Sequence, residues 1–213
     1  MEGQLPIVVI RARRKSLTLT VNRKGEVIVR APYRVAFGEI EKFVQLHRDW
    51  IERRISEKAR GEADLSDGAE YDLFGERVVL ACGRTRCTNS VLYLPQSGRE
   101  TAFRNFLIAL ARDTMTRITD EIASAYGFSY QGLRISGARG RWGSCSATGK
   151  IAYSFRIAFL PTEICRAIAA HELCHTRVFN HGSAFWNEVA QIVPDYSSVR
   201  KYLKAHQYVM NYL

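Results

Sequence analysis

The sequence has no long apolar segment of the kind that crosses a lipid bilayer. A membrane-spanning helix needs roughly 18 or more consecutive apolar residues, and the apolar run at residues 6–10 is far shorter and is followed at once by basic residues. The first four residues also lack the pattern of a secretory signal, and no repeat or low-complexity stretch is visible. We therefore expect a cytoplasmic protein without a membrane-spanning helix.

Cysteine is scarce, and its spacing shows no pairing. The chain has five cysteines, an odd number, and no two of them form a CxxC pair. This pattern excludes a disulfide framework and a cysteine-rich zinc module, and it agrees with a reducing compartment. The five are Cys82, Cys87, Cys145, Cys165 and Cys174. We expect Cys165 and Cys174 to be small buried residues.

Acidic residues are outnumbered by basic ones, mostly near the amino terminus. Residues 1–60 contain 14 Lys or Arg against 7 Asp or Glu, a net charge of +7, whereas the remaining residues contribute only +3 to the total of +10. A basic appendage can bring an enzyme to nucleic acid or to acidic partners, although a basic face often serves only solvation. Nucleic acid is therefore a possible partner of the amino-terminal region.

Histidine is also rare, yet three of the five histidines fall within eleven positions. His171-Glu172-Leu173-Cys174-His175 has the HExxH pattern, and His181 follows it. On a helix, residues 171 and 175 lie one turn apart, so both rings can reach one metal ion at about 2.0–2.1 Å. Glu172 projects to the side of that pair, where it can deprotonate a water at the open coordination position. The motif thus predicts a catalytic zinc site.

The segment before the motif has the features of a buried helix. Pro161 suits a first helical position, and Ile164 and Ile168 lie on the same stripe as the two histidines of the motif. The apolar stripe therefore leads directly to the metal ligands. A helix fixed in this way in the core would hold its ligands rigidly, as a catalytic metal requires.

His181 is the predicted third ligand. Asn180 and Gly182 on either side of it tolerate positive φ, so the chain can turn back towards the metal, and Ser183 can cap a new helix. Three histidines at this spacing match a known zinc geometry. Val178 stands where metzincins carry a glycine, so the chain does not read as a metzincin.

Two carboxylates downstream are alternative third ligands. Glu188 lies thirteen residues after His175, and Asp195 lies twenty residues after it. Glu188 could instead orient an imidazole from outside the ligand set. An exposed position on a helix is the simpler reading for Glu188.

Several short motifs accompany the HExxH segment. The most specific is Arg-Trp-Gly-Ser-Cys at residues 141–145; the others lie at residues 13–17, 25–27, 29–32, 151–161, 180–186 and 193–196. With these motifs the sequence resembles the YgjP-like zinc metallopeptidases, which look related to the SprT-like and Wss-type proteases. It departs at Ser154, in a stretch where that family often carries an asparagine. The resemblance implies a zincin-like core, a Zn²⁺ cofactor and hydrolysis of peptide bonds.

The order of predicted elements indicates an α+β fold in two parts. The expected parts are a basic, strand-rich α+β module at residues 1–97 and a zincin-like core of helices with a small sheet at residues 98–213. We predict strands at residues 7–12, 16–22, 26–30, 70–73, 77–82, 90–94, 133–136 and 150–159, and a hairpin turn at residues 23–25. We predict helices at residues 36–60, 100–126 with Gly127 as carboxyl cap, 161–175, 183–194 and 197–212.

The expected mechanism is hydrolysis of a peptide bond by a zinc-bound water that Glu172 activates. The strand within residues 151–159 could hold an extended protein or peptide substrate by edge pairing. Candidates for stabilising the oxyanion or shaping the cleft are Arg141, Trp142 and Tyr153. Cys145 could approach the metal, although a packing role is the simpler reading.

Two other classes of function use the same residues. The first is a zinc-dependent hydrolase of a non-peptide amide or ester. The second is a nucleic-acid-associated protein whose zinc is structural. Three histidines, an adjacent glutamate and no cysteine ligand argue against the second, because structural zinc sites usually fill all four positions with protein groups.

Overall fold

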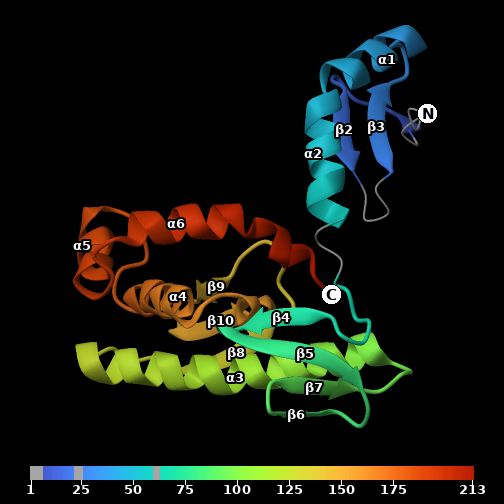
Figure 1. Cartoon of the computed structure of the whole chain (residues 1–213). Helices are drawn as coiled ribbons and strands as arrows, with labels where there is room; N and C mark the ends of the chain where they lie inside the picture. The colour runs from blue at the N-terminus through green and yellow to red at the C-terminus, as the bar shows by residue number, and fades with distance from the viewer. Residues whose placement is uncertain (1–6, 22–25, 60–62) are drawn as a thin grey trace. The chain divides into compact units, whose positions relative to one another are not determined.

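The computed structural model describes residues 7–21, 26–59 and 63–213, which form two compact units, Met1–Glu62 and Ala63–Leu213 (Figure 1). The division therefore falls earlier than the expected boundary at residue 97. The physical reason is the core of the second unit. Leu80 and Leu92, which precede residue 97, are buried in one apolar cluster with Phe103 and Leu107, which follow it.

The first unit is a three-stranded sheet with two helices. Strands β1 (Ile7–Ala12), β2 (Thr18–Val21) and β3 (Val27–Pro32) are arranged in the order β1-β3-β2, with β1 parallel and β2 antiparallel to β3. The expected single helix is divided into α1 (Phe37–Leu46) and α2 (Arg48–Ala59). His47 ends α1 with φ −109° and ψ 15°, outside the helical range. The hairpin turn expected at residues 23–25 lies outside the described residues.

The second unit opens with a four-stranded sheet. Its strands are β4 (Glu70–Leu73), β5 (Glu76–Cys82), β6 (Arg86–Thr88) and β7 (Val91–Leu94), in the order β4-β5-β7-β6. Phe74 and Gly75, both with positive φ, form the tight turn between β4 and β5. The sequence did not predict β6, whose three residues are all exposed and therefore show no apolar alternation.

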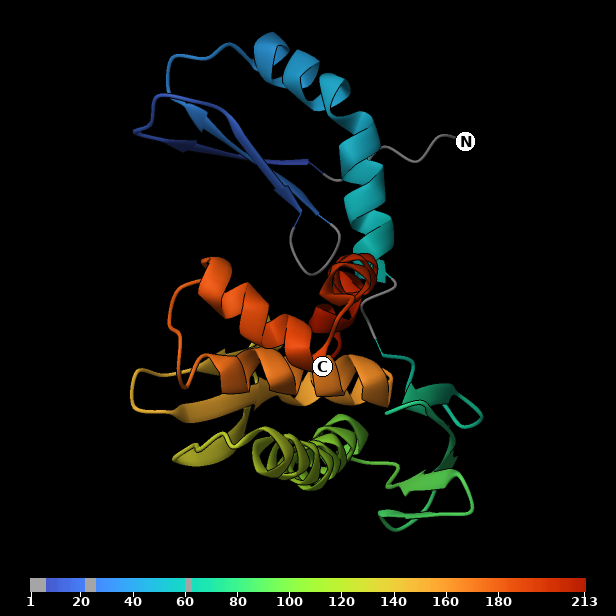
Figure 2. The same cartoon turned by 90° about the vertical axis from the view of Figure 1, so that its left-hand side faces the viewer.

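Helix α3 (Arg99–Tyr126) packs along α4 (Thr162–Cys174), and buried side chains of both helices belong to the core of the second unit (Figures 1 and 2). A buried stripe at every third or fourth position of α3 provides the contact surface, from Phe103 to Ile122. The helix ends at Gly127, which has φ 67° and whose N–H bonds to the Ala123 carbonyl. This confirms the predicted glycine cap.

A small sheet supports the end of α4 that carries the histidines. It consists of β8 (Gly132–Ser136), β9 (Gly143–Cys145) and β10 (Lys150–Ser154), with β10 in the middle, parallel to β8 and antiparallel to β9. The strand expected over residues 150–159 ends at Ser154, because its hydroxyl accepts the Arg156 N–H and starts the short 3-10 helix η1 (Phe155–Phe159). Ser154, where the sequence departs from the family pattern, is thus the residue at which β10 ends and η1 begins.

The chain closes with α5 (Ser183–Ile192), α6 (Tyr196–Ala205) and the 3-10 helix η2 (Gln207–Asn211). The expected single helix at residues 197–212 is divided at His206, whose φ of −99° and ψ of 14° leave the α region. Among the described residues, no helix is both long and apolar enough to span a membrane. The mixed helices and small sheets agree with the predicted α+β, zincin-like architecture.

Candidate metal centre and active site

Three imidazoles meet at the carboxyl end of α4. The Nε2 atom of His175 lies 3.2 Å from Nε2 of His171 and 3.1 Å from Nε2 of His181, and the third pair is 3.1 Å apart. These are the residues that the sequence predicts as ligands. The structure therefore brings all three of them to one point, although His181 comes from a separate segment of the chain.

Local hydrogen bonds turn the chain between the second and third histidines. His175 ends α4 in the right-handed helical region. The Val178 N–H donates to the Cys174 carbonyl at 2.9 Å and closes one further turn. The Asn180 side chain then accepts the Gly182 N–H at 3.1 Å, directly before α5 begins. His181 lies between these two residues and is delivered to the site by that small turn.

A buried ring forms the floor of the histidine cluster. Phe185, on the first turn of α5, has no exposed surface. Its ring stacks on His175 at 4.4 Å between centroids and meets His171 edge-on at 4.9 Å. The floor of the cluster is therefore apolar.

The cluster fits a tetrahedral metal ion. Ligands about 2.0–2.1 Å from a zinc ion at tetrahedral angles would have their nitrogens about 3.3 Å apart, close to the observed separations. His175 directs Nδ1 at the Val178 carbonyl at 3.1 Å. That carbonyl can only accept a hydrogen bond, so Nδ1 carries the hydrogen and Nε2 keeps a lone pair for a metal. The three residues therefore form a group that could hold a metal ion at the point where their Nε2 atoms meet.

Burial also disfavours charged imidazoles in the cluster. Desolvation, with smaller effects from His175 and His181, lowers the pKa of His171 to about 3. Burial likewise lowers the pKa of His175. Neutral imidazoles are the form that binds a metal ion. Within the described residues, His171 Nδ1 is buried without a hydrogen-bond partner.

Glu172 lies beside the cluster and is only 6% exposed. Its burial raises the pKa of the carboxyl to about 7, and the nearby charge of Arg141 opposes that rise. The carboxylate fits tightly against Gly143 of β9, where a Cβ on that residue would lie 2.5 Å from Oε1. The glycine of the Arg-Trp-Gly-Ser-Cys string therefore leaves room for the predicted base.

An aromatic wall completes the site, and the sequence did not assign it a role. Tyr196, at the start of α6, stacks on His171 with centroids 5.5 Å apart and planes 19° apart. Trp186 lies 5.4 Å from Tyr196 and 5.7 Å from His181. Burial raises the pKa of Tyr196, and the charge of Glu172 adds to that rise. The only signal for Tyr196 was its place in the 193–196 motif, because its contact with α4 is non-local.

The two alternative third ligands lie outside the cluster. Asp195 accepts hydrogen bonds from the Ser197 hydroxyl at 2.8 Å and the Ser198 N–H at 3.1 Å, so it caps α6. Glu188 lies 4.0 Å from Arg177 across a weak ion pair. Among the described residues, the group placed to hold a metal consists of the three histidines. The Val178 carbonyl, not Glu188, contacts the Nδ1 atom of His175.

The candidates for the cleft separate into core and site residues. Tyr153 is fully buried, and its hydroxyl lies 3.2 Å from the Thr119 hydroxyl in the core, so it cannot meet a substrate. Trp142 is 8% exposed, and its indole N–H has no partner in the described part of the chain. Arg141 is exposed and acts electrostatically on Glu172. Cys145 is half-buried and is not among the candidate metal ligands.

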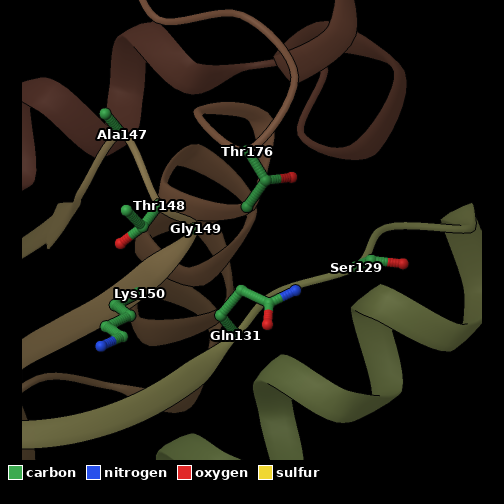
Figure 3. A pocket seen from close by; sticks show the side chains of 7 residues that line it. All are labelled: Ser129, Gln131, Ala147, Thr148, Gly149, Lys150 and Thr176. Carbon is green, nitrogen blue, oxygen red and sulfur yellow. The ribbon is translucent and has the colours of Figure 1, made fainter.

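A polar depression of about 540 Å³ lies just beyond the end of α4. Figure 3 shows the side chains that line it, with hydroxyl and amide groups from three separate loops. Thr176, which directly follows His175, forms one side, and Thr148 of the β9–β10 turn and Lys150 at the start of β10 form another. This depression adjoins the segment that carries the candidate metal ligands.

Comparison with known proteins identifies the family. The model of the YgjP-like metallopeptidase domain matches residues 15–206. Among solved structures, the metallopeptidase zymogen of Pyrococcus abyssi abylysin is similar at a TM-score of 0.40 and 21% identity, covering 44% of this chain and 95% of that one. No significant match was found among curated proteins. Because the family match extends over most of both units, the chain belongs to the YgjP-like metallopeptidase family.

Proposed function

We propose that this metallopeptidase uses zinc, held by His171, His175 and His181, and that Glu172 transfers the proton during peptide hydrolysis. The observation that carries the proposal is the convergence of three Nε2 atoms, 3.1–3.2 Å apart, beside a buried carboxylate. Neither the histidine cluster nor the buried carboxylate alone would be sufficient to support hydrolysis. Together they supply a metal site and a base on one helix.

The donor set favours zinc in a catalytic role. Three imidazole nitrogens suit a borderline-soft ion of tetrahedral preference, and three protein ligands leave one position open. Bound zinc would supply Lewis acidity, which lowers the pKa of water and polarises a carbonyl. All three ligands are neutral, so the protein would not reduce the charge of the ion.

Glu172 has the position and environment of a general base. It directly follows His171 on α4, and Gly143 fixes its carboxylate from the other side. A buried carboxylate has a raised proton affinity, so it can accept a proton from water and return it to the departing amine. Both transfers need only one carboxylate, and Glu172 directly follows the first histidine of the group on α4.

The position of β10 argues against it as the strand that binds substrate. We expected an extended peptide to pair with the strand within residues 151–159, but β10 already has β8 on one side and β9 on the other. Strands β8 and β9 are the two edges of this sheet, and β9 is the one whose Gly143 lies against Glu172. We propose that the peptide backbone pairs with β9, which would bring it past the base.

Two substitutions test the metal and the base separately. Glu172→Gln should keep about one zinc per chain and lower peptide hydrolysis by a factor of 10² or more, because a neutral amide cannot accept the proton. His181→Ala should lose most of the zinc, measured by metal analysis after dialysis. Full zinc content in His181→Ala would remove that histidine from the ligand set, and undiminished hydrolysis by Glu172→Gln would remove the base.

The alternatives are less well supported. Family membership favours peptide bonds over a non-peptide amide or ester. An open coordination position beside a buried carboxylate suits catalysis better than a structural zinc site. No observation on the described residues favours a nucleic-acid partner, so that possibility remains a prediction from charge alone.

A further inference from the structure

A separate cavity of about 570 Å³ lies at the opposite end of α4 from the histidines. Its lining includes Pro161, which directly precedes α4, whereas His171 is ten residues further along. At 1.5 Å per residue the two ends are about 15 Å apart. The cavity also takes residues from β4, β5, α6 and η2, so the carboxyl-terminal segment is one of its walls.

The wall of this cavity is aromatic. Phe159 and Tyr212 meet edge-on at 5.0 Å, and Tyr208 lies 6.1 Å from Tyr212. His206 stacks on Tyr202 at 3.9 Å with planes 12° apart. These five residues are half-buried, so part of each ring remains accessible. Aromatic faces carry negative electrostatic potential and attract cations placed above them.

The rim of the cavity carries an excess of negative charge. Glu70 and Asp72, both on β4, share one cation, since Arg77 lies 3.0 Å from Glu70 and 3.1 Å from Asp72. Two carboxylates against one guanidinium leave a net charge of −1. The field of Asp72 extends to the aromatic wall, because it adds to the rise in the pKa of Tyr202 that burial mainly causes. The rim therefore favours a cationic guest and disfavours an anionic one.

A further acceptor comes from His206. Its Nδ1 lies 2.9 Å from the Tyr202 carbonyl, which can only accept, so Nδ1 carries the hydrogen in this arrangement. In the neutral ring, Nε2 is then left with a lone pair. The lining thus combines π-faces, a ring acceptor and carboxylates, and this set matches the donors of a guanidinium or ammonium group.

We propose that this cavity is an exosite for a basic side chain, arginine or lysine, of a protein or peptide. The cation would lie against the tyrosine faces with its donors directed at Asp72 and Glu70. An occupant of this kind follows from charge complementarity, because the guest supplies the positive charge that the rim lacks. The site is distinct from the metal centre, so it would add substrate or partner recognition remote from the bond that is cut.

The test uses the full-length chain in its zinc-loaded form with Glu172→Gln, so that peptides are not cut. The probe is acetyl-Gly-Gly-Arg-Gly-Gly-amide, titrated by saturation-transfer NMR, and its counterpart carries citrulline, which is neutral and nearly isosteric. We expect the arginine peptide to bind at least five times more tightly. The lysine peptide should also bind, because it offers the same charge.

Variants locate the binding. Asp72→Asn and Tyr202→Leu should each weaken binding of the arginine peptide at least threefold, while Asp113→Asn, at an exposed position on α3 outside the cavity, should have no effect. Circular dichroism verifies that each variant is folded, and Asp72→Asn preserves the size of the side chain. Equal binding of the two peptides, no binding, or unchanged affinity in Asp72→Asn would overturn the exosite. Zinc content, measured in parallel, reports independently on the metal centre.

Discussion

At the scale of single residues, the site depends on one position without a side chain. A carboxylate that is to work as a base must be buried enough to bind a proton and fixed enough to aim at water. The backbone of Gly143 meets both requirements for Glu172, since it lies directly against the carboxylate. In the proposed mechanism the HExxH motif supplies the base, and Gly143, which is distant in the sequence, would hold its carboxylate in place.

Gly143→Ala should therefore disable the enzyme while leaving the metal in place. An added Cβ would lie 2.5 Å from Oε1 and 2.8 Å from Cγ of Glu172, so the carboxylate would have to move. A displacement of about 1 Å can cost 10²-fold in rate, and we expect a loss of kcat of that order with about one zinc per chain. Gly140→Ala is the matched control, because no atom lies within 4 Å of its Cβ. Equal activity in both variants would contradict this role.

Tyr196 should support the metal through its ring. It stacks on His171 at 5.5 Å, and aromatic pairs of this kind contribute about 0.5–1.5 kcal/mol. Tyr196→Leu should therefore weaken zinc binding by about 2–12-fold, measured by competition with a chromogenic chelator. Tyr196→Phe keeps the ring and should bind zinc as the parent does. A loss of zinc affinity in Tyr196→Phe would instead mean that the hydroxyl matters.

At the scale of elements, the proposed pairing with β9 would fix the direction in which a peptide substrate runs through the site. Extended chains paired at a sheet edge direct alternate N–H groups towards the neighbouring strand. A scan of peptide substrates, each N-methylated at one amide, should therefore show a two-residue alternation in kcat/KM. Each backbone hydrogen bond contributes about 0.5–1.5 kcal/mol, so sensitive positions should lose about 2–12-fold. A scan without alternation would exclude pairing with this strand.

Elements with a strong local pattern were predicted from the sequence, and elements fixed by distant contacts were not. Strands β1 and β4 have the predicted bounds, as the alternation and the turns around them are local. Strand β9 has three half-buried residues in a glycine- and serine-rich stretch and forms only because β10 pairs with it. The site residues show the same difference. The predicted ligands and base were found from a local sequence motif, whereas the position of Tyr196 depends on how α6 packs.

At the scale of the whole molecule, each of the two units has its own hydrophobic core. Residues such as Val27, Val29 and Ile51 are fully buried in the first unit, and a separate cluster fills the second. The family match covers residues of both units, although the predicted ligands and base all lie in the second. A metal held by the second unit should therefore stabilise that unit directly.

Removal of the metal should lower the melting temperature of one unit only. Binding to the folded state at 1,000 times Kd adds about 4 kcal/mol to the free energy of unfolding. For a unit of this size, each kcal/mol raises the melting temperature by roughly 2–4 °C, so excess zinc over the chelated form should give about 8–16 °C. Scanning calorimetry of the full chain should show this shift in the larger transition, with the transition of the first unit unchanged. His181→Ala should show no such shift, and a single transition that moves as a whole would mean that the two units unfold together.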